Sequence, residues 1–248
     1  MTARQIQAKS ILTKSGIQGI AYCVNPYVGC SHGCVYCYAT FMKRFTGHRE
    51  PWGKFLDVKI NAAALLARQI KRAHQGTILL SSVTDCYQPA EAKYRVTRAC
   101  LEVLADSPFP VDILTKSPLV LRDMDLLKRF RRLDVGFTVT TGDEAVRRIF
   151  EPGAPSIKAR IEALKTLHDN GISTYAFIGP ILPLEPEELA DWIRPHVESV
   201  LIDRMNYPSK TVAIYRRRML GRWLSGPFLA EIVERLKKAL APVPVECC

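Results

Sequence analysis

The sequence lacks the features that carry a chain into or across a membrane. No uninterrupted apolar stretch approaches the roughly 20 residues that cross a bilayer. Residues 1–19 are polar and basic, without the apolar core of a signal peptide. We therefore expect a cytoplasmic protein with no membrane partner.

Several familiar catalytic signatures are also missing. No Ser-His-Asp order, Walker loop or glycine-rich dinucleotide motif follows an expected strand, and the five histidines show no metal-binding spacing. Low-complexity segments, long linkers and internal repeats are absent as well. These absences argue against serine hydrolases, P-loop enzymes, nicotinamide-dependent enzymes and repeat architectures.

Acidic residues are scarce relative to basic ones. The chain has 24 Asp and Glu against 35 Lys and Arg, a formal net charge of +11, and residues 204–248 alone carry nine Lys or Arg against three Glu. Such an excess favours an anionic partner, either nucleic acid or a phosphorylated substrate. Solvated basic faces would give the same count, so charge alone does not decide.

Cysteine is unusually frequent. Eight cysteines are many for a chain in a reducing compartment, where a disulfide framework is not expected, so metal binding or thiol chemistry is the better expectation. Four of them lie within residues 23–37, and Cys247 and Cys248 end the chain.

Short β-branched runs alternate with helical stretches along most of the chain. Strands are expected over 19–24, 77–82, 111–115, 135–140, 174–178 and 199–203, and helices over 62–73, 96–105, 119–130, 157–170 and 186–196. This alternation predicts an α/β fold, a partial (β/α)₆ barrel of the TIM type, with an open side. We expect residues 1–207 to form the barrel with its cysteine loop, and residues 208–248 a basic helical C-terminal extension.

The cysteine loop carries the strongest chemical signal. Cys30, Cys34 and Cys37 are spaced C-x₃-C-x₂-C, and Gly29 and Gly33 permit the turns that point the sulfurs inward. Three thiolates can hold three irons of a [4Fe–4S] cluster and leave the fourth iron open. The alternative is zinc, which needs four ligands; here Cys23 or His32 would have to be the fourth, and no second C-x₂-C pair follows.

The spacing C-x₃-C-x-aromatic-C, with Tyr36 as the aromatic, resembles the radical S-adenosylmethionine superfamily. Three further segments, Asn25-Pro26-Tyr27, Thr84-Asp85-x-Tyr87-Gln88-Pro89-x-Glu91 and Leu114-Thr115-Lys116-Ser117, look like its group related to spore photoproduct lyase. The resemblance implies an enzyme in which S-adenosylmethionine chelates the open iron. Its reductive cleavage would give a 5′-deoxyadenosyl radical, with electrons from a donor such as flavodoxin or ferredoxin.

The resemblance also implies contacts to S-adenosylmethionine. Lys116 would bind its carboxylate, and Ser82, Thr84 and Asp85 would lie where its amino group is recognised. Thr138 and Thr140 fall where a ribose or carboxylate contact is expected, and Ile178 and Gly179 fall where adenine packs. Tyr36 belongs to the same cofactor site. A Ser or Thr at a strand end also commonly caps the next helix, which is the alternative for these hydroxyls.

Cys86 is a candidate catalytic residue with three open interpretations. In spore photoproduct lyases a cysteine near the C-terminal ends of the strands donates hydrogen to a product radical. The corresponding position in this sequence carries Ser82. Cys86 is therefore a displaced hydrogen donor, a ligand to a second cluster, or an ordinary small side chain.

Together these features predict a radical S-adenosylmethionine enzyme acting on a nucleic acid or a nucleotide-containing substrate. Two alternatives stay open. One is radical modification of a peptide or small metabolite; the other is a non-catalytic, metal-containing nucleic-acid binding protein.

Overall fold

The computed structural model describes residues 3–205 and 207–247, so Cys248 lies outside the described residues. The chain forms two compact units. The first comprises Met1–Gly33 and Ala39–Val135, and the second comprises Cys34–Tyr38 and Gly136–Cys248. This division passes through the cysteine motif, so Cys30 belongs to the first unit while Cys34 and Cys37 belong to the second.

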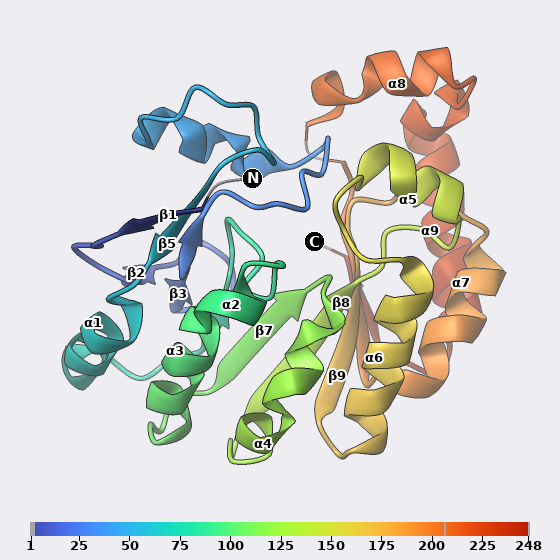
Figure 1. Cartoon of the computed structure of the whole chain (residues 1–248). Coiled ribbons are helices and arrows are strands. Elements are labelled where there is room, and N and C mark those ends of the chain that lie inside the picture. Colours follow the sequence, from blue (N-terminus) through green and yellow to red (C-terminus); the bar gives the residue numbers. More distant parts are fainter. Residues whose placement is uncertain (1–2, 206, 248) are drawn as a thin grey trace. The chain divides into compact units, whose positions relative to one another are not determined.

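The first unit contains two groups of strands (Figure 1). The larger follows the order β2 (Leu12–Lys14), β3 (Tyr22–Val24), β6 (Ile78–Leu80) and β7 (Val111–Thr115). Strands β3, β6 and β7 run parallel, and β2 joins β3 in antiparallel orientation. In the smaller sheet β5 (Leu56–Lys59) lies between β1 (Ala3–Ile6) and β4 (Tyr27–Val28), and β4 leads directly into the cysteine loop.

Four helices belong to the first unit: α1 (Ala62–Gln69), α2 (Glu91–Tyr94), α3 (Val96–Ala105) and α4 (Met124–Leu127). Short 3₁₀ helices cover Ile70–Arg72 and Pro118–Asp123, and another covers Tyr38–Phe45. Helix α3 buries Val96, Cys100, Leu101 and Leu104, a helical spacing that turns one face inward. This face and the central residues of β6 form the core of the unit, together with α1, which contacts α3.

The strands of the second unit follow the order β8 (Leu133–Thr138), β9 (Ser173–Ile178), β10 (Ser199–Ile202) and β11 (Val245–Cys247). β9 and β10 are parallel, as are β10 and β11. Its helices are α5 (Glu144–Phe150), α6 (Ile157–Asp169), α7 (Pro186–Ile193), α8 (Val212–Arg217) and α9 (Gly226–Leu240). Further 3₁₀ helices cover Arg194–His196, Pro208–Lys210 and Gly221–Leu224.

Local chemistry fixes where the helices of the second unit begin. The Asp143 carboxylate accepts hydrogen bonds from the N–H groups of Ala145 and Val146 at the start of α5. Ser156 caps α6 in the same way through the N–H of Ala159. Helices α7 and α9 pack against each other, as the orange and red ribbons of Figure 1 show.

The expected α/β class is confirmed, with parallel strands, connecting helices and, among the described residues, no closed barrel. The helix expected over 119–130 is instead the 3₁₀ helix Pro118–Asp123 followed by the short α4. Strands β1, β2, β4, β5 and β11 were not expected. The predicted division at residue 207 stays a prediction, although β11, from the expected helical extension, pairs with β10.

No helix in the described part of the chain is long and apolar enough to span a bilayer.

Candidate functional site in the cysteine loop and at the strand ends

The part of the cysteine loop in the first unit is held by the turn that follows β6. The Thr84 hydroxyl donates to the Gly29 carbonyl over 2.6 Å, and the Gln88 amide donates to the same oxygen over 3.3 Å. The Gln88 carbonyl accepts from both the N–H and the hydroxyl of Ser31, at 2.9 and 3.1 Å. One glutamine thus binds the loop on both sides of Cys30.

Glycines allow this loop to fold tightly. Gly29 has φ +90°, and a Cβ there would lie 2.6 Å from the Phe55 carbonyl oxygen. Gly33 has φ +59° and faces Gly53 so closely that a Cβ on Gly53 would lie 2.8 Å from the Gly33 Cα. The turns expected at Gly29 and Gly33 are therefore present. Gly29 has no room for a side chain, whereas Gly33 takes a left-handed conformation that glycine adopts most readily.

Asp85 lies at the centre of a buried polar network. Its Oδ1 accepts from the Tyr87 N–H and the Thr115 hydroxyl, both at 2.8 Å, and its Oδ2 accepts from the Lys116 N–H at 2.9 Å. The Nδ1 of His32, a side chain only 1% exposed, lies 3.4 Å from the same Oδ2. Asp85 thereby connects the ends of β6 and β7 to the cysteine loop.

Tyr27, just before the loop, is anchored by a second buried carboxylate. Its hydroxyl donates to Glu91, which is fully buried and also accepts from the Thr97 N–H and from Arg122. Burial first, and then the Glu91 charge, raise the pKa of Tyr27 far above its usual value. The phenol therefore stays protonated and acts as a donor.

Cys86 lies in the core of the first unit, with no exposed surface. Burial raises the pKa of its thiol well above the usual value, and the nearby Asp85 charge adds to the effect. Its carbonyl accepts from the Thr97 hydroxyl at 2.7 Å. Full burial agrees with the third interpretation, a small side chain in the core, and the catalytic role of Cys86 stays a prediction.

The second unit holds its part of the loop through Glu151. The Tyr36 hydroxyl donates to Glu151 Oε1, and the Thr140 hydroxyl donates to the same oxygen at 3.1 Å. Arg160 forms a 2.5 Å ion pair with Glu151 Oε2 and donates to the Thr138 carbonyl at 3.0 Å. Glu151 and Arg160 are both fully buried. Desolvation, followed by the neighbouring Cys34 and Glu151, raises the pKa of Tyr36.

Backbone contacts complete the hold on this segment. The Val35 N–H donates to the Phe150 carbonyl at 2.9 Å, and the Cys37 N–H donates to the Cys34 carbonyl at 3.2 Å. The Lys210 ammonium donates to the Cys37 carbonyl at 2.6 Å. The last residue of α5 and the 3₁₀ helix Pro208–Lys210 therefore both bind the backbone of the cysteine loop in the second unit.

The other expected cofactor residues lie at strand ends. Ser82 accepts from the Asn25 amide at 3.2 Å, and Lys116 is half-buried just after β7. Ile178 ends β9 and is fully buried. A Cβ on Gly179 would lie 2.4 Å from the Phe177 ring. Each of these residues lies at or just after the C-terminal end of a strand, and their contacts to S-adenosylmethionine stay a prediction.

The donor chemistry of the loop fits an iron–sulfur cluster. Cys30 and Cys34 are each 8% exposed and Cys37 is half-buried, so the three thiols are largely shielded from water. Thiolates are the usual ligands of such clusters. The described residues hold no group of three or more His, Cys, Asp or Glu side chains already placed around one metal position. The joint ligation by these three cysteines therefore stays a prediction.

Gln88, Glu91, Glu151 and Arg160 were not singled out from the sequence. A signal existed for Arg160, because Ile157, Arg160, Leu164 and Leu167 fall on one helical face and an arginine in such a stripe needs an internal partner. Gln88 and Glu91 belong to the segment Thr84–Glu91 that carries the family resemblance, although no role was assigned to them from the sequence. Glu151 has no comparable signal, because its burial depends on elements distant in sequence.

Comparisons with known proteins decide the family. The family model for the radical SAM superfamily matches residues 24–194. The chain belongs to the radical SAM superfamily. It is an enzyme, and this family generally cleaves S-adenosylmethionine with the help of a [4Fe–4S] cluster.

Similar proteins come from several sources. An uncharacterized protein of Methanocaldococcus jannaschii is 43% identical over 180 residues, which cover 72% of this chain and 67% of that protein. An uncharacterized protein of Mycobacterium tuberculosis is 30% identical over 203 residues, 74% of this chain and 57% of that protein. The radical SAM Nalpha-GlyT isomerase of Pseudomonas phage M6 is 26% identical over 165 residues, 66% of this chain and 34% of that protein.

Among solved structures, spore photoproduct lyase complexed with dinucleoside spore photoproduct matches with a TM-score of 0.74. The match covers 99% of this chain and 82% of that one, at 14% identity, and so shows a common fold. Streptococcus suis SuiB bound to precursor peptide SuiA matches with a TM-score of 0.59 at 15% identity, covering 91% of this chain and 48% of that one. The expected resemblance to the spore photoproduct lyase fold is confirmed.

Proposed function

We propose that this radical SAM enzyme acts on a nucleic acid or a nucleotide-containing substrate. In this proposal Cys30, Cys34 and Cys37 hold the [4Fe–4S] cluster. One electron delivered through the cluster, from an external donor such as flavodoxin or ferredoxin, cleaves bound S-adenosylmethionine into methionine and a 5′-deoxyadenosyl radical. The C-x₃-C-x₂-C loop, in a chain that belongs to this family, is the observation that supports the cluster and the radical chemistry in this proposal.

Lys116 is proposed to bind the carboxylate of S-adenosylmethionine, where a cation offsets negative charge near the cluster thiolates. Asp85 supports this assignment as a positioning residue, because it binds the Lys116 N–H and lies beside His32 of the loop. Its two oxygens already accept three hydrogen bonds, which leaves little capacity for the ammonium of the ligand. We therefore give the ammonium contact to Ser82 and Thr84 together with Asp85, not to Asp85 alone.

In the second unit Thr138, Thr140, Ile178 and Gly179 are proposed to contact the ribose and adenine of S-adenosylmethionine. The Thr140 hydroxyl already donates to Glu151, so its oxygen is left to accept a hydrogen bond from a ribose hydroxyl. The proposed function of Tyr36 is to fix the loop through Glu151.

Three observations support the substrate class. The net charge is +11, which favours polyanions. A relative is named as an isomerase of Nalpha-GlyT, and a protein of the same fold was solved with a dinucleoside. SuiB, which shares the fold at a lower TM-score, was solved with a peptide, so peptides are the second class to test.

The test is isotope transfer. Reconstituted, reduced protein is mixed with S-adenosylmethionine and either a deuterated oligonucleotide or a deuterated peptide. Abstraction breaks a C–D bond of the substrate and forms a C–D bond in 5′-deoxyadenosine, which mass spectrometry detects. The proposal predicts deuterium transfer from the oligonucleotide. Transfer from the peptide alone would reject the nucleic-acid assignment and keep the radical chemistry.

A further inference from the structure

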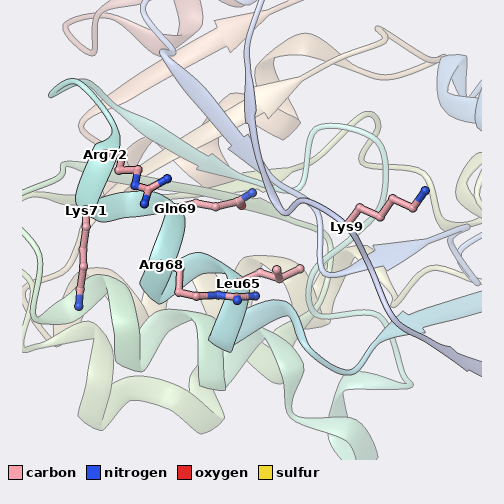
Figure 2. Close-up of a pocket in the computed structure, with 6 residues that line it drawn as sticks. All are labelled: Lys9, Leu65, Arg68, Gln69, Lys71 and Arg72. Carbon is pink, nitrogen blue, oxygen red and sulfur yellow. The ribbon is translucent and has the colours of Figure 1, made fainter.

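A cluster of unpaired cations surrounds a cavity beside β2 and α1 in the first unit. Lys9, Arg68, Lys71 and Arg72, all exposed, line a cavity of about 490 Å³ together with Leu65 and Gln69. Figure 2 shows Lys9 extending from the N-terminal segment, while the other residues come from α1 and the 3₁₀ turn after it. We call these four cations the basic cluster.

The N-terminal segment is fixed against α1 at both ends of that helix. Asn61, before α1, accepts from the Ala8 N–H at 2.8 Å and donates to the Ala8 carbonyl at 2.9 Å. Gln69, in the last turn, accepts from the N–H groups of Ile11 and Leu12, both at 3.0 Å. The backbone that carries the lysine is therefore held in place, and the cavity has a defined wall.

The charge of the basic cluster is not balanced inside the protein. Among the described residues none of its four cations forms an ion pair or a side-chain hydrogen bond, whereas Arg98 and Arg122 each bind carboxylates. The C-terminal dipole of α1 favours Arg68, Lys71 and Arg72 at the helix end. It does not explain Lys9, which comes from a different segment and adds a like charge.

We infer that the basic cluster binds the phosphate backbone of the nucleic acid; this rests on the substrate class proposed above. Several exposed cations on two segments suit a chain of phosphates better than one phosphate group. The lining contains no aromatic ring on which a base could stack. The basic cluster therefore positions the strand without reading its sequence.

The test compares two triple variants that lose the same charge. The first is Lys9→Gln/Arg68→Gln/Arg72→Gln; Gln69 and Asn61 stay intact. The control is Arg148→Gln/Lys158→Gln/Lys165→Gln, which removes three exposed cations from α5 and α6. Fluorescence anisotropy with a labelled single-stranded oligonucleotide measures affinity at several salt concentrations, and circular dichroism checks folding.

The first variant is expected to bind about tenfold more weakly at moderate salt. The slope of log affinity against log salt should fall by about 2, because three phosphate contacts at about 0.7 each are lost. The control variant should bind within about twofold of wild type, with the wild-type slope. Formation of 5′-deoxyadenosine without nucleic acid should be the same in all three proteins.

Three results would overturn the inference. If both variants lose affinity equally, or neither does, the basic cluster is not the site, and the proposed function stands. If wild-type protein binds no oligonucleotide, the proposed substrate class fails and the inference fails with it. If polyglutamate competes as strongly as the oligonucleotide, the basic cluster recognises negative charge in general and not a phosphate backbone.

Discussion

Two buried carboxylates hold the two parts of the cysteine motif. Asp85 binds the Lys116 N–H and lies near His32, and Glu151 binds Tyr36 and Arg160. A buried carboxylate is costly unless its oxygens are hydrogen-bonded. Here the partners come from the loop, from the strand ends and, for Glu151, from Arg160 of α6, so the cost of desolvation is offset by contacts that also order the site.

Asp85→Asn tests whether Asp85 positions the loop. An amide has one accepting oxygen, so one N–H or hydroxyl that Asp85 now binds loses its partner. We expect the free energy of unfolding of the cluster-free protein to fall by about 1–3 kcal/mol in urea unfolding. Asp106→Asn, at an exposed ion pair with Arg129, is the control and should change it by less than about 1 kcal/mol. Unchanged stability with weakened S-adenosylmethionine binding would show a ligand contact instead.

The Glu151–Arg160 pair is expected to be more sensitive. Arg160→Leu leaves a fully buried carboxylate without its cation, and should lower the free energy of unfolding by about 3–5 kcal/mol. Adding Glu151→Leu removes the carboxylate that Arg160→Leu leaves without a cation, so the double variant should be more stable than Arg160→Leu alone. Denaturant unfolding measures both. A double variant less stable than the single one would contradict this account of the pair.

The residues that contact the cysteine loop come from elements far apart in sequence. The turn after β6 carries Gln88, which binds the loop at Gly29 and Ser31. Phe55, the residue just before β5, supplies the backbone carbonyl against which the loop packs at Gly29. The loop is therefore preorganised by these neighbours together with its own glycines.

Gly29→Ala should disturb this preorganisation. The new Cβ would lie 2.6 Å from the Phe55 carbonyl in a backbone with φ +90°, which costs on the order of 1–3 kcal/mol. We expect lower thermal stability and less iron bound after reconstitution. Gly16→Ala is the matched control, since no atom lies within 4 Å of its Cβ and its φ is not positive. Normal iron loading of the Gly29 variant would show that the loop tolerates displacement.

Elements with strong local signals were predictable. Strand β7 and helix α3 have the expected bounds, because β-branched runs and helical apolar spacing are local properties. Strand β4 has two residues and exists through its pairing with β5, so nothing local marks it. The 119–130 segment looked helical, but Pro118 begins a 3₁₀ helix there instead.

Of the candidate site, only the residues that belong to a recognisable sequence motif could be predicted. Cysteine spacing indicated Cys30, and the resemblance to the family indicated Asp85 and Lys116, because both patterns are visible along the chain. The buried partners of these residues depend on tertiary contacts. Glu151 is indistinguishable in sequence from the exposed Glu102 or Glu162, and only burial separates them.

For the whole molecule, family membership and net charge lead to separate conclusions. Membership in the radical SAM superfamily concerns how a radical is generated, and it rests on a match over residues 24–194. The charge of +11 concerns which substrate is recruited. The two parts of the account can therefore fail independently, and the cysteine motif is the part on which the chemistry depends.

The most direct test of that chemistry is the iron content and 5′-deoxyadenosine yield of Cys30→Ala, Cys34→Ala and Cys37→Ala after anaerobic reconstitution and reduction. Wild type and the exposed control Cys247→Ala should each bind about four irons and form 5′-deoxyadenosine. Each of the three variants should lose the cluster absorption and form no 5′-deoxyadenosine, because three ligands leave no substitute. Full iron content and full product yield in any one of them would contradict the account.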